Sequence, residues 1–498
     1  MSMNGQDTKS NPPVIQLNNV SKVYEIQGEK RAICDDIDLN VQPGEFIILE
    51  GENGSGKSTL LKLILGLEIP NSGYVRLWGE SPQLASSKLR VGTTLQKAKP
   101  IDSLRVEELV NLFRSYYPQP LDMEEILNRT NLQEKRKDMA IHLSGGQEQA
   151  LYFALAIAGN PDLLLLDEPT RNLDKDASQQ FWQQVGEFAK QGKTIIAVSH
   201  NQSDREIMEN MATRVLQIKN GSLQEENLSS SPPSQPAASA SANETSKIPF
   251  GKAFWSQIQV ERLDLLRKPG FILSIFAFSL LPLLFPEEDA GTLKNYIILL
   301  AGFNLFLIAL QSFSMRIATE RVQGWITLLK ATPLPAWVYI AAKVTAAFVV
   351  AVFSLAIILG IGASKLGNEA TIGFFIQTFL GLSLGIIPFA ILGFAIGYLL
   401  EPKATSIATV FVLLLAMATI GVPLSMLPYP VQNAIAFSPF YHYGQVVATA
   451  ADLQILPNAD FPDVKDGHFF LHVLWLVWTG IAASLLAIWS YQRDRVSG

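Results

Sequence analysis

The chain has 498 residues, of which 48% are hydrophobic and 17% are charged, and its formal net charge is -6. This length exceeds one ordinary hydrophobic core, so two or more units are expected. The negative charge and the lack of a Lys/Arg stripe argue against a nucleic-acid partner. The single cysteine, Cys34, excludes an intrachain disulfide and argues against a metal–thiolate cluster.

The chain begins with a polar segment, 1–13, which we expect to be a flexible tail. It has no apolar h-region and therefore predicts no secretory signal. The next segment, 14–225, mixes charged residues with short apolar runs, as is typical of a soluble domain. We expect this domain to stay on the side of the membrane where it is made.

The stretch "EFIILEGENGSGKSTLLKLILGL" predicts a strand, a glycine-rich turn and a helix, and residues 51–58 fit G-x-x-x-x-G-K-[ST] in that context. Backbone N–H groups and the helix N-terminus favour phosphate there, because small residues leave the backbone accessible: Gly54, Ser55 and Gly56. Lys57 is expected to reach the β- and γ-phosphates, and the Ser58 hydroxyl to ligate Mg²⁺.

Two later apolar runs predict strands that are buried on both faces. "LLLLDEPT" ends in Asp167 and Glu168, and "TIIAVSH" ends in His200. Ligands bind at the carboxyl ends of parallel strands, so these side chains are expected to meet the phosphate loop. Asp167 suits Mg²⁺, and Glu168 is placed to polarise a water molecule in line with the γ-phosphate. An isolated histidine is more often structural, but the position of His200 favours a functional role.

Taken in order, "GENGSGKST", "LQ", "LSGGQ", "LLLLDEPT", "NLD" and "VSH" resemble the ATPase domain of ABC transporters over residues 14–222. The resemblance implies an α/β P-loop NTPase fold that binds ATP and Mg²⁺. It also implies that Tyr24 stacks on adenine and that Gln96 senses nucleotide beside the metal and faces the membrane domain. Asp174 would be the D-loop aspartate, and His200 the switch histidine that contacts the γ-phosphate.

The same resemblance implies the complete set of site residues. The catalytic residues would be Lys57, Glu168 and His200. The metal would be held by Ser58, Gln96 and Asp167. Nucleotide would be bound by Tyr24, Gln96 and Asp174 together with residues of the P-loop and signature motifs: Gly51, Asn53, Gly54, Ser55, Gly56, Lys57, Ser58, Thr59, Ser144, Gly145, Gly146 and Gln147.

Two features depart from the family pattern. The run after LSGGQ, "EQALYFALAIAG", has no basic residue, and the D-loop reads "RNLD" instead of a form with smaller residues. Neither departure changes the catalytic residues, so ATP hydrolysis is expected to be intact. We expect both to affect the interface between ATPase domains.

The signature motif predicts a partner. In the family it completes the nucleotide site of the opposite ATPase domain, and this chain has one P-loop motif and one LSGGQ. The sequence therefore predicts a dimer of half-transporters, either a homodimer or a heterodimer.

Segment 226–249 is rich in Ser, Pro and Ala and has no apolar period, so we expect a flexible linker, with a cluster of phosphorylation sites as the alternative. From 250 to 498 we expect an all-α membrane domain of six spans, because its apolar stretches approach or exceed the roughly 20 residues that cross a bilayer. The expected spans are 271–286, 295–315, 336–363, 371–400, 404–427 and 469–490. Six buried helices of a soluble protein are the alternative, but such helices carry polar faces.

The loops of this domain differ in charge. Basic residues flank one set of span ends, including Arg267, Arg316, Lys403 and Arg493, and the alternate loops are acidic. By the positive-inside rule both ends of the membrane domain are cytoplasmic. We therefore expect a bacterial plasma (inner) membrane protein whose ATPase domain and termini face the cytoplasm.

Three segments of the membrane domain have further interpretations. Segment 252–268 reads as an interfacial amphipathic helix, with an ordinary packed helix as the alternative. Segment 320–337 resembles the coupling helix of type V ABC exporters, and 424–444 resembles their short re-entrant or surface helices. Polar residues within spans either line a substrate route or join helices, and none is assigned to substrate: Asn304, Gln311, Lys343 and Gln377.

The leading hypothesis is an ATP-driven exporter of a drug, a lipid or a lipid-linked glycan, which rests on family analogy. A membrane machine that signals or extracts lipids is the alternative, although the longest outer loop, 451–468, is short for that class. A soluble ABC ATPase acting on DNA or ribosomes is disfavoured by the apolar spans.

Overall fold

The computed structural model describes residues 12–26, 28–96, 98–199, 201–226, 249–285, 289–421, 430, 435, 437–451 and 469–493. Its contacts divide the chain into two compact units. The first contains Met1–Ser256, Gly324–Pro335 and Asp494–Gly498, and the second contains Gln257–Gln323 and Ala336–Arg493. The expected linker lies almost wholly outside the described residues, as does most of the N-terminal tail.

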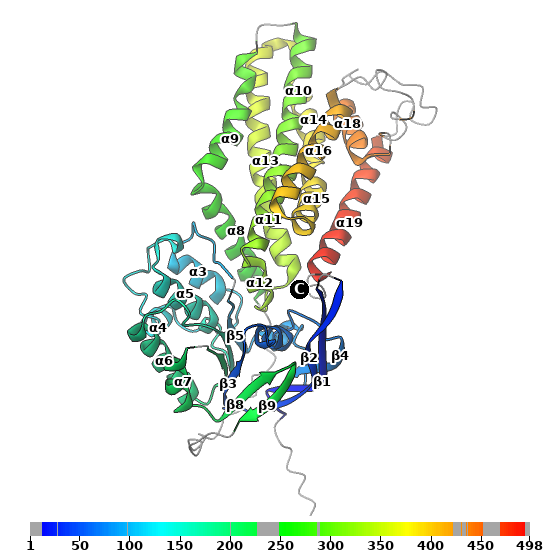
Figure 1. Cartoon of the computed structure of the whole chain (residues 1–498). Helices are drawn as coiled ribbons and strands as arrows, with labels where there is room; N and C mark the ends of the chain where they lie inside the picture. The colour runs from blue at the N-terminus through cyan, green and yellow to red at the C-terminus, as the bar shows by residue number, and fades with distance from the viewer. Residues whose placement is uncertain are drawn as a thin grey trace, which may run out of the picture. The chain divides into compact units, whose positions relative to one another are not determined.

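The first unit contains two sheets (Figure 1). An antiparallel sheet has the order β2-β1-β4, with β1 Ile15–Ile26, β2 Glu29–Val41 and β4 Ser72–Leu77. A six-stranded sheet has the order β5-β6-β7-β3-β8-β9, and only the β8–β9 pair is antiparallel. Its strands are β3 Phe46–Gly51, β5 Val91–Thr94, β6 Leu163–Asp167, β7 Thr194–Val198, β8 Arg214–Lys219 and β9 Ser222–Glu226.

The central strands of this sheet are apolar and fully buried. Every residue of β6 and of β7 is buried, which explains their continuous apolar sequences. Because β3, β6 and β7 run parallel, the segments that follow them emerge at one edge of the sheet. The helices of this unit are α1 Lys57–Ile64, α2 Ala85–Lys88, α3 Val106–Arg114, α4 Met123–Arg129, a 3₁₀ turn Ala140–His142, α5 Gly145–Ile157, α6 Lys175–Lys190 and α7 Gln202–Glu209.

The second unit is helical. Its elements are α8 Phe250–Leu266, α9 Pro269–Ser279, a 3₁₀ turn Leu281–Leu284, α10 Ala290–Phe306, a π-helical turn Leu307–Ser312, α11 Phe313–Val322, α13 Ala336–Leu366, a 3₁₀ turn Gly367–Glu369, α14 Ile372–Ser383, α15 Ile386–Leu399, α16 Pro402–Gly421, α18 Pro439–Ala450 and α19 Phe469–Arg493. The start of α8, up to Ser256, and the short helix α12, Trp325–Lys330, are grouped with the first unit.

Four helices among the described residues are long and apolar enough to span a membrane: Ala290–Val322, Ala336–Glu369, Ile372–Leu399 and Phe469–Tyr491. They correspond to four of the six expected spans. The expected span 271–286 is shorter in the structure, because α9 ends at Ser279 and a 3₁₀ turn that contains Pro282 follows. The span expected at 404–427 begins as α16, and its residues after 421 lie outside the described part, so the number six stays a prediction.

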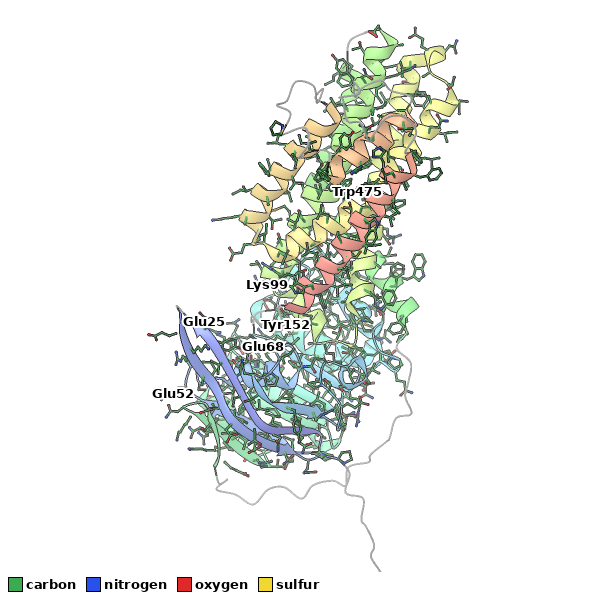
Figure 2. All side chains as sticks on the ribbon, turned by 90° about the vertical axis from the view of Figure 1, so that its right-hand side faces the viewer. Glu25, Glu52, Glu68, Lys99, Tyr152 and Trp475 are labelled. Carbon is green, nitrogen blue, oxygen red and sulfur yellow. The ribbon has the colours of Figure 1, made fainter. Side chains whose placement is uncertain are left out.

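Side chains join several of these helices. On α18 and α19, the His442 ring stacks on Trp475 with centroids 4.6 Å apart, and the Nδ1 atoms of His442 and His472 lie 2.8 Å apart. Trp475 is seen on α19 in Figure 2. In the spans themselves, Ser354 donates to the Oδ1 of Asn304 at 3.0 Å. Asn304 therefore joins helices.

A buried ionic cluster connects α8, α11 and α13. Arg316 donates to Glu261 at 2.9 Å and to Asp264 at 2.7 Å. Lys343 lies 2.6 Å from Glu261 and also donates to Glu320. The Lys343 side chain is 1% exposed, so its charge is paired inside the protein.

The segment expected to be an interfacial amphipathic helix, 252–268, is helical as α8, and its apolar residues do not all lie on one exposed face. Leu265 is buried at 9% exposure, whereas Trp255 and Leu266 are 64% and 62% exposed. The carboxylates Glu261 and Asp264 are buried instead, because Arg316 and Lys343 supply partners that the local sequence does not reveal.

Candidate functional site

The phosphate loop connects β3 to α1, and its backbone conformation depends on Gly51 and Gly56. Gly56 has φ 111°, and a Cβ atom there would lie 2.8 Å from the Ile33 carbonyl oxygen. Gly51 has φ 148°, and its Cβ would lie 2.7 Å from the Ile218 carbonyl oxygen. Only glycine fits these positions, so the loop backbone stays open towards an anion at the α1 N-terminus.

Lys57 is the first residue of α1 and is 6% exposed. Its Nζ donates to the carbonyl oxygens of Gly51 and Glu52, at 2.8 Å each, and so bridges the loop. Burial lowers the pKa of Lys57, while Glu168 and Asp167 act in the opposite direction. The ammonium group therefore lies at the centre of the loop, beside both carboxylates.

Asp167 ends β6 and is 6% exposed. Burial raises the pKa of Asp167; its hydrogen bond with Ser58 acts against that rise, and the neighbouring Glu168 adds to it. Its Oδ1 atom is buried and has no hydrogen-bond partner among the residues that the structure describes. An unsatisfied buried carboxylate oxygen is costly, so it indicates a position for a ligand.

Glu168 has φ 49°, a left-handed conformation that is uncommon outside glycine. Its backbone N–H donates to Val198 at 3.1 Å, which ties the turn to the end of β7. Gln96, which lies just after β5, donates from Nε2 to the Glu168 Oε2 at 2.6 Å. Backbone strain such as that of Glu168 is common in functional sites. The structure thus brings four of the expected site residues to the same sheet edge: Lys57, Gln96, Asp167 and Glu168.

The oxygen donors suit Mg²⁺. Ser58 supplies a hydroxyl, and Asp167 supplies the buried Oδ1 that lacks a partner. Hard divalent cations of this size prefer oxygen ligands. The residues therefore fit a Mg²⁺ ion held by Ser58 and Asp167. Gln96 offers an amide oxygen nearby, since its amide nitrogen is the atom bound to Glu168.

Tyr24 lies near the end of β1 and is half-buried. Its hydroxyl donates to Glu68, and burial together with this bond raises the pKa of Tyr24 well above its ordinary value. Thr59 on α1 also contacts that hydroxyl, so Tyr24 lies beside the phosphate-loop helix. Glu68 is 2% exposed and pairs with Lys22 at 3.5 Å, a buried contact that the sequence analysis did not identify.

The signature motif forms the N-terminus of α5. Ser144 is the N-cap: its hydroxyl accepts from the Gln147 N–H at 3.4 Å, and the Gln147 side chain accepts from the Ser144 N–H at 3.1 Å. Ser144 and Gly145 are exposed. A Cβ on Gly145 would lie 3.7 Å from Asn172, so the signature motif and the D-loop of one chain are neighbours.

The remaining expected residues have these positions. Asp174 caps α6 by accepting from the Ala177 N–H at 2.8 Å, and it is exposed. Asn53 and Gly54 are exposed on the phosphate loop, and the Ser55 hydroxyl is buried with no partner in the described part of the chain. His200 lies outside the described residues, so its position is not part of this site description.

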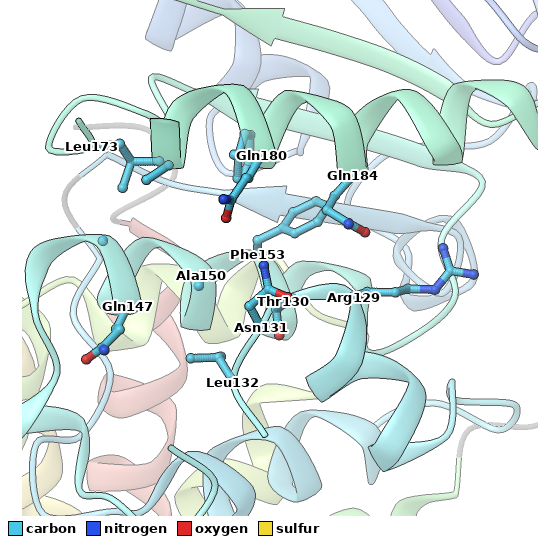
Figure 3. A pocket seen from close by; sticks show the side chains of 13 residues that line it. Arg129, Thr130, Asn131, Leu132, Gln147, Ala150, Phe153, Leu173, Gln180 and Gln184 are labelled. Atoms are coloured by element: carbon cyan, nitrogen blue, oxygen red, sulfur yellow. The ribbon is translucent and has the colours of Figure 1, made fainter. Parts of the chain in front are cut away.

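A cavity of about 150 Å³ lies between α4, α5 and α6, next to the signature motif (Figure 3). Phe153 and Phe181 pack edge to face there with ring centroids 4.9 Å apart. Amide side chains from α5 and α6 line its polar part: Gln147, Gln180 and Gln184. The cavity thus lies beside the Phe153–Phe181 contact that joins the signature helix to the helix after the D-loop.

Asp204 is a residue that the sequence analysis missed. It is fully buried on α7 and accepts hydrogen bonds from Thr170, Ser178 and Ser199. These three side chains come from the segment after Glu168, from α6 and from the end of β7. Asp204 therefore holds the catalytic edge together. The sequence shows only that Asp204 lies in the first turn of a helix, α7, whose N-cap is Asn201.

Within the segment expected to resemble a coupling helix, 320–337, Gly324 has φ 80° and caps α12. Trp325 is 1% exposed, and its ring meets Phe113 of α3 edge to face at 6.0 Å. Lys88 donates to the Lys330 carbonyl oxygen, and Ala331 belongs to the apolar core of the first unit. The segment Gly324–Pro335 is thus an integral part of that unit.

Comparison with protein families agrees with this geometry. The model described as "ABC transporter" matches residues 34–171, and the model described as "ABC-2 family transporter protein" matches residues 119–489. The second match covers well over half of the chain. The chain belongs to the ABC-2 family of transporters, with an N-terminal ABC ATPase domain and an ABC-2 type membrane domain.

Individual relatives match less than half of the chain. An uncharacterized ABC transporter ATP-binding protein of Mycobacterium tuberculosis is 32% identical over 224 residues, covering 42% of this chain and 89% of the relative. The Nod factor export ATP-binding protein I of Cupriavidus metallidurans is 34% identical, covering 39% and 65%. The macrolide export ATP-binding/permease protein MacB of Wolinella succinogenes is 32% identical, covering 42% and 34%.

Among solved structures, a bacterial ABC transporter cassette with a dimeric structure is 29% identical, with a TM-score of 0.40, and the match covers 43% of this chain and 98% of that one. From the family and the curated relatives, the protein is an integral membrane ABC transporter that binds ATP and couples its hydrolysis to transport. The expected fold class is confirmed to this level.

Proposed function

We propose that the protein is an exporter that works as a dimer of half-transporters, each nucleotide being held between two chains. The observation that carries the proposal is the exposed N-terminus of α5. Among the described residues, the phosphate-loop cavity is lined by 31–33, 51–55 and 217–221. Ser144 and Gly145 are exposed and are not part of this lining in their own chain. A helix N-terminus with accessible N–H groups suits the γ-phosphate held by a second copy.

Within each site, Lys57 would neutralise charge on the β- and γ-phosphates, and glycine N–H groups would hold the phosphate oxygens. Glu168 would orient and polarise the attacking water, and Gln96, bonded to Glu168 at 2.6 Å, would report the state of the site. Tyr24 would pack on adenine, with Asn53 and Thr59 as further contacts. Asp174 would act at the interface, and His200 would contact the γ-phosphate.

Ser58 and Asp167, with Gln96, would hold Mg²⁺, which supplies positive charge to the phosphate oxygens when bound. In this arrangement the raised pKa of Asp167 matters, because only the carboxylate form is a ligand.

We further propose that α12 is the coupling helix of a type V exporter-like membrane domain of six spans. Its burial against Phe113 and beside Lys88 supports this role, since α12 connects α11 with α13 in the membrane unit. Movement of α3 on ATP binding would then displace the ends of both helices.

The proposed location is a bacterial inner membrane with the ATPase domain and both termini cytoplasmic, which the charge pattern of the loops supports. The proposed substrate is hydrophobic or amphipathic. Two relatives of the ATPase half bear names that refer to export, of Nod factor and of macrolides, and this supports export as the direction.

Mixed dimers test the shared site. One chain carries Lys57→Ala and the other Ser144→Arg, and the two are separated by different affinity tags. If sites form between chains, each homodimer is inactive at both sites, whereas the mixed dimer keeps one intact site and about half of the wild-type ATP hydrolysis. An inactive mixed dimer with normal folding would contradict the proposal.

A membrane machine that signals or extracts lipids is the alternative. Accumulation of a labelled hydrophobic compound in inverted vesicles, dependent on ATP and lost in Glu168→Gln, separates the two. ATP hydrolysis without accumulation of any compound class would favour the alternative.

A further inference from the structure

Helix α8 sorts its charges onto opposite faces. Its only two carboxylates, Glu261 and Asp264, are 1% and 2% exposed and are paired with Arg316 and Lys343. From Lys252 onward, the exposed residues of α8 recur every three or four positions and so form one stripe along the helix: Lys252, Trp255, Gln259, Arg262 and Leu266. This stripe contains two cations, an aromatic ring and no carboxylate.

The depth of α8 in the membrane follows from its partners. Lys343 lies on the span-length helix Ala336–Glu369, seven residues after its first residue and thus about 10 Å along its axis. A hydrocarbon core takes about 20 of these 34 residues, so Lys343 lies in the part of the helix nearest one membrane surface. Because Glu261 lies 2.6 Å from Lys343, the middle of α8 is at the same level, near that surface.

The stripe has the composition that suits this level. Tryptophan and long cationic side chains favour the membrane interface, since their apolar parts face acyl chains and their polar ends face water. The exposed fractions of Trp255 and Leu266, 64% and 62%, leave these side chains available to lipid. Lysine and arginine there are attracted to negatively charged headgroups.

We propose that the exposed face of α8 binds the headgroups of anionic phospholipids, with Arg262 and Lys252 as the charged contacts and Trp255 as the interfacial anchor. The buried ion pairs make this possible, because they remove both carboxylates of α8 from the face that meets lipid. Lys268 adds a third cation beside the stripe, and it is shared with Asp264 at 2.6 Å. Lipid binding would stabilise α8 on α11 and α13, the helices that flank α12.

The test uses the full chain in neutral detergent without nucleotide, so it does not depend on ATP hydrolysis. Phosphatidylglycerol or phosphatidylcholine is titrated, and the midpoint of thermal unfolding is followed. We expect phosphatidylglycerol to raise the midpoint more than phosphatidylcholine does. Arg262→Gln should weaken the apparent affinity for phosphatidylglycerol about fivefold, which corresponds to about 1 kcal/mol, and adding Lys252→Gln should weaken it further.

Two control variants sharpen the result. Arg262→Lys keeps the charge and is expected to retain most of the affinity. Lys403→Gln removes an exposed cation from the start of α16, away from the stripe, and is expected to behave as wild type. The preference for phosphatidylglycerol over phosphatidylcholine should also fall at high ionic strength, because exposed charges are screened by salt.

Several outcomes would overturn the proposal. Equal stabilisation by the two lipids would show that the face responds only to apolar surface. An equal loss in Lys403→Gln would indicate a general effect of net charge. If glycerol phosphate, which has no acyl chains, stabilised the protein equally, the cations would bind a soluble anion. If a soluble acidic peptide did so, they would bind a protein partner.

Discussion

The nucleotide site of the first unit and the ionic cluster of the second unit differ in how their buried charges are satisfied. In the ATPase unit, Asp167 has a buried oxygen with no partner among the described residues, and Glu168 is held in a left-handed conformation. In the membrane unit, the carboxylates Glu261 and Glu320 are neutralised by Lys343 within the protein. A buried charged group that lacks a hydrogen-bond partner, next to a strained backbone, indicates a place where a ligand binds. Buried charged groups that pair with one another indicate a structural contact.

The largest expected effect comes from Glu168→Gln, which keeps the shape of the side chain and removes the charge that activates water. We expect ATP hydrolysis to fall at least about 100-fold while ATP binding is retained. The measurement is steady-state phosphate release together with equilibrium binding of a labelled ATP analogue.

Glu206→Gln is the matched control, since it changes an exposed carboxylate on α7 outside the site. Turnover of Glu168→Gln near the wild-type rate would remove Glu168 from the mechanism and weaken the contrast between the two units.

Lys343→Met tests the membrane side of the comparison. It leaves Glu261 and Glu320 buried without their shared cation, and loss of one partner of a buried pair costs about 3–5 kcal/mol. We expect a clear fall in the midpoint of thermal unfolding in detergent. Adding Glu320→Gln should recover part of that loss, because one unpaired charge is then removed.

Lys403→Met, at an exposed position on α16, is expected to leave the midpoint unchanged. If Lys343→Met were equally harmless, the cluster would contribute nothing to stability and its structural role would be wrong.

Gly56→Ala sharpens the comparison at the phosphate loop. The new Cβ would meet the Ile33 carbonyl oxygen at 2.8 Å, and φ 111° is strained for alanine, with a cost of about 1–3 kcal/mol. We expect weaker ATP binding and a lower unfolding midpoint. Gly251→Ala is the control, since nothing lies within 4 Å of its added Cβ, and it should change neither quantity.

The smallest expected effect is on the stability of the nucleotide-free protein in Asp167→Asn. Burial raises the pKa of Asp167, so the folded state disfavours the charged form. The resulting destabilisation is present above the pKa of an unfolded aspartate and disappears as the pH falls below it. At neutral pH, Asp167→Asn should therefore raise the unfolding midpoint by roughly a few degrees, while hydrolysis that depends on Mg²⁺ is lost. A fall in the midpoint would contradict this account of Asp167.

Local sequence was enough to predict the parts of the site that depend on local geometry. The spacing of Gly51, Gly56 and Lys57 specifies the loop, and the continuous apolar residues of β6 and β7 specify strands buried on both faces. The parallel order of these strands then brings Asp167 to the loop. The ABC family was recognised from the same motifs, and the family comparison confirms it.

Contacts between distant segments were not predictable in this way. Gln96 meets Glu168 across 72 positions, and the three partners of Asp204 come from separate elements. The inward face of α8 depends on Arg316 and Lys343, which lie on helices later in the chain. Periodicity alone suggested an apolar face for α8, because a buried carboxylate is favoured only when a specific cation is present.

The central claim is that the signature motif of one chain meets the phosphate loop of another. The native protein has one cysteine, Cys34, which is buried, so two introduced cysteines can report on this directly. Ser144→Cys and Asn53→Cys, both exposed, are combined with Glu168→Gln and oxidised with and without ATP. The account expects an ATP-dependent covalent dimer of twice the chain mass. A crosslink confined to the monomer, or a dimer that forms equally in each single-cysteine variant, would contradict it.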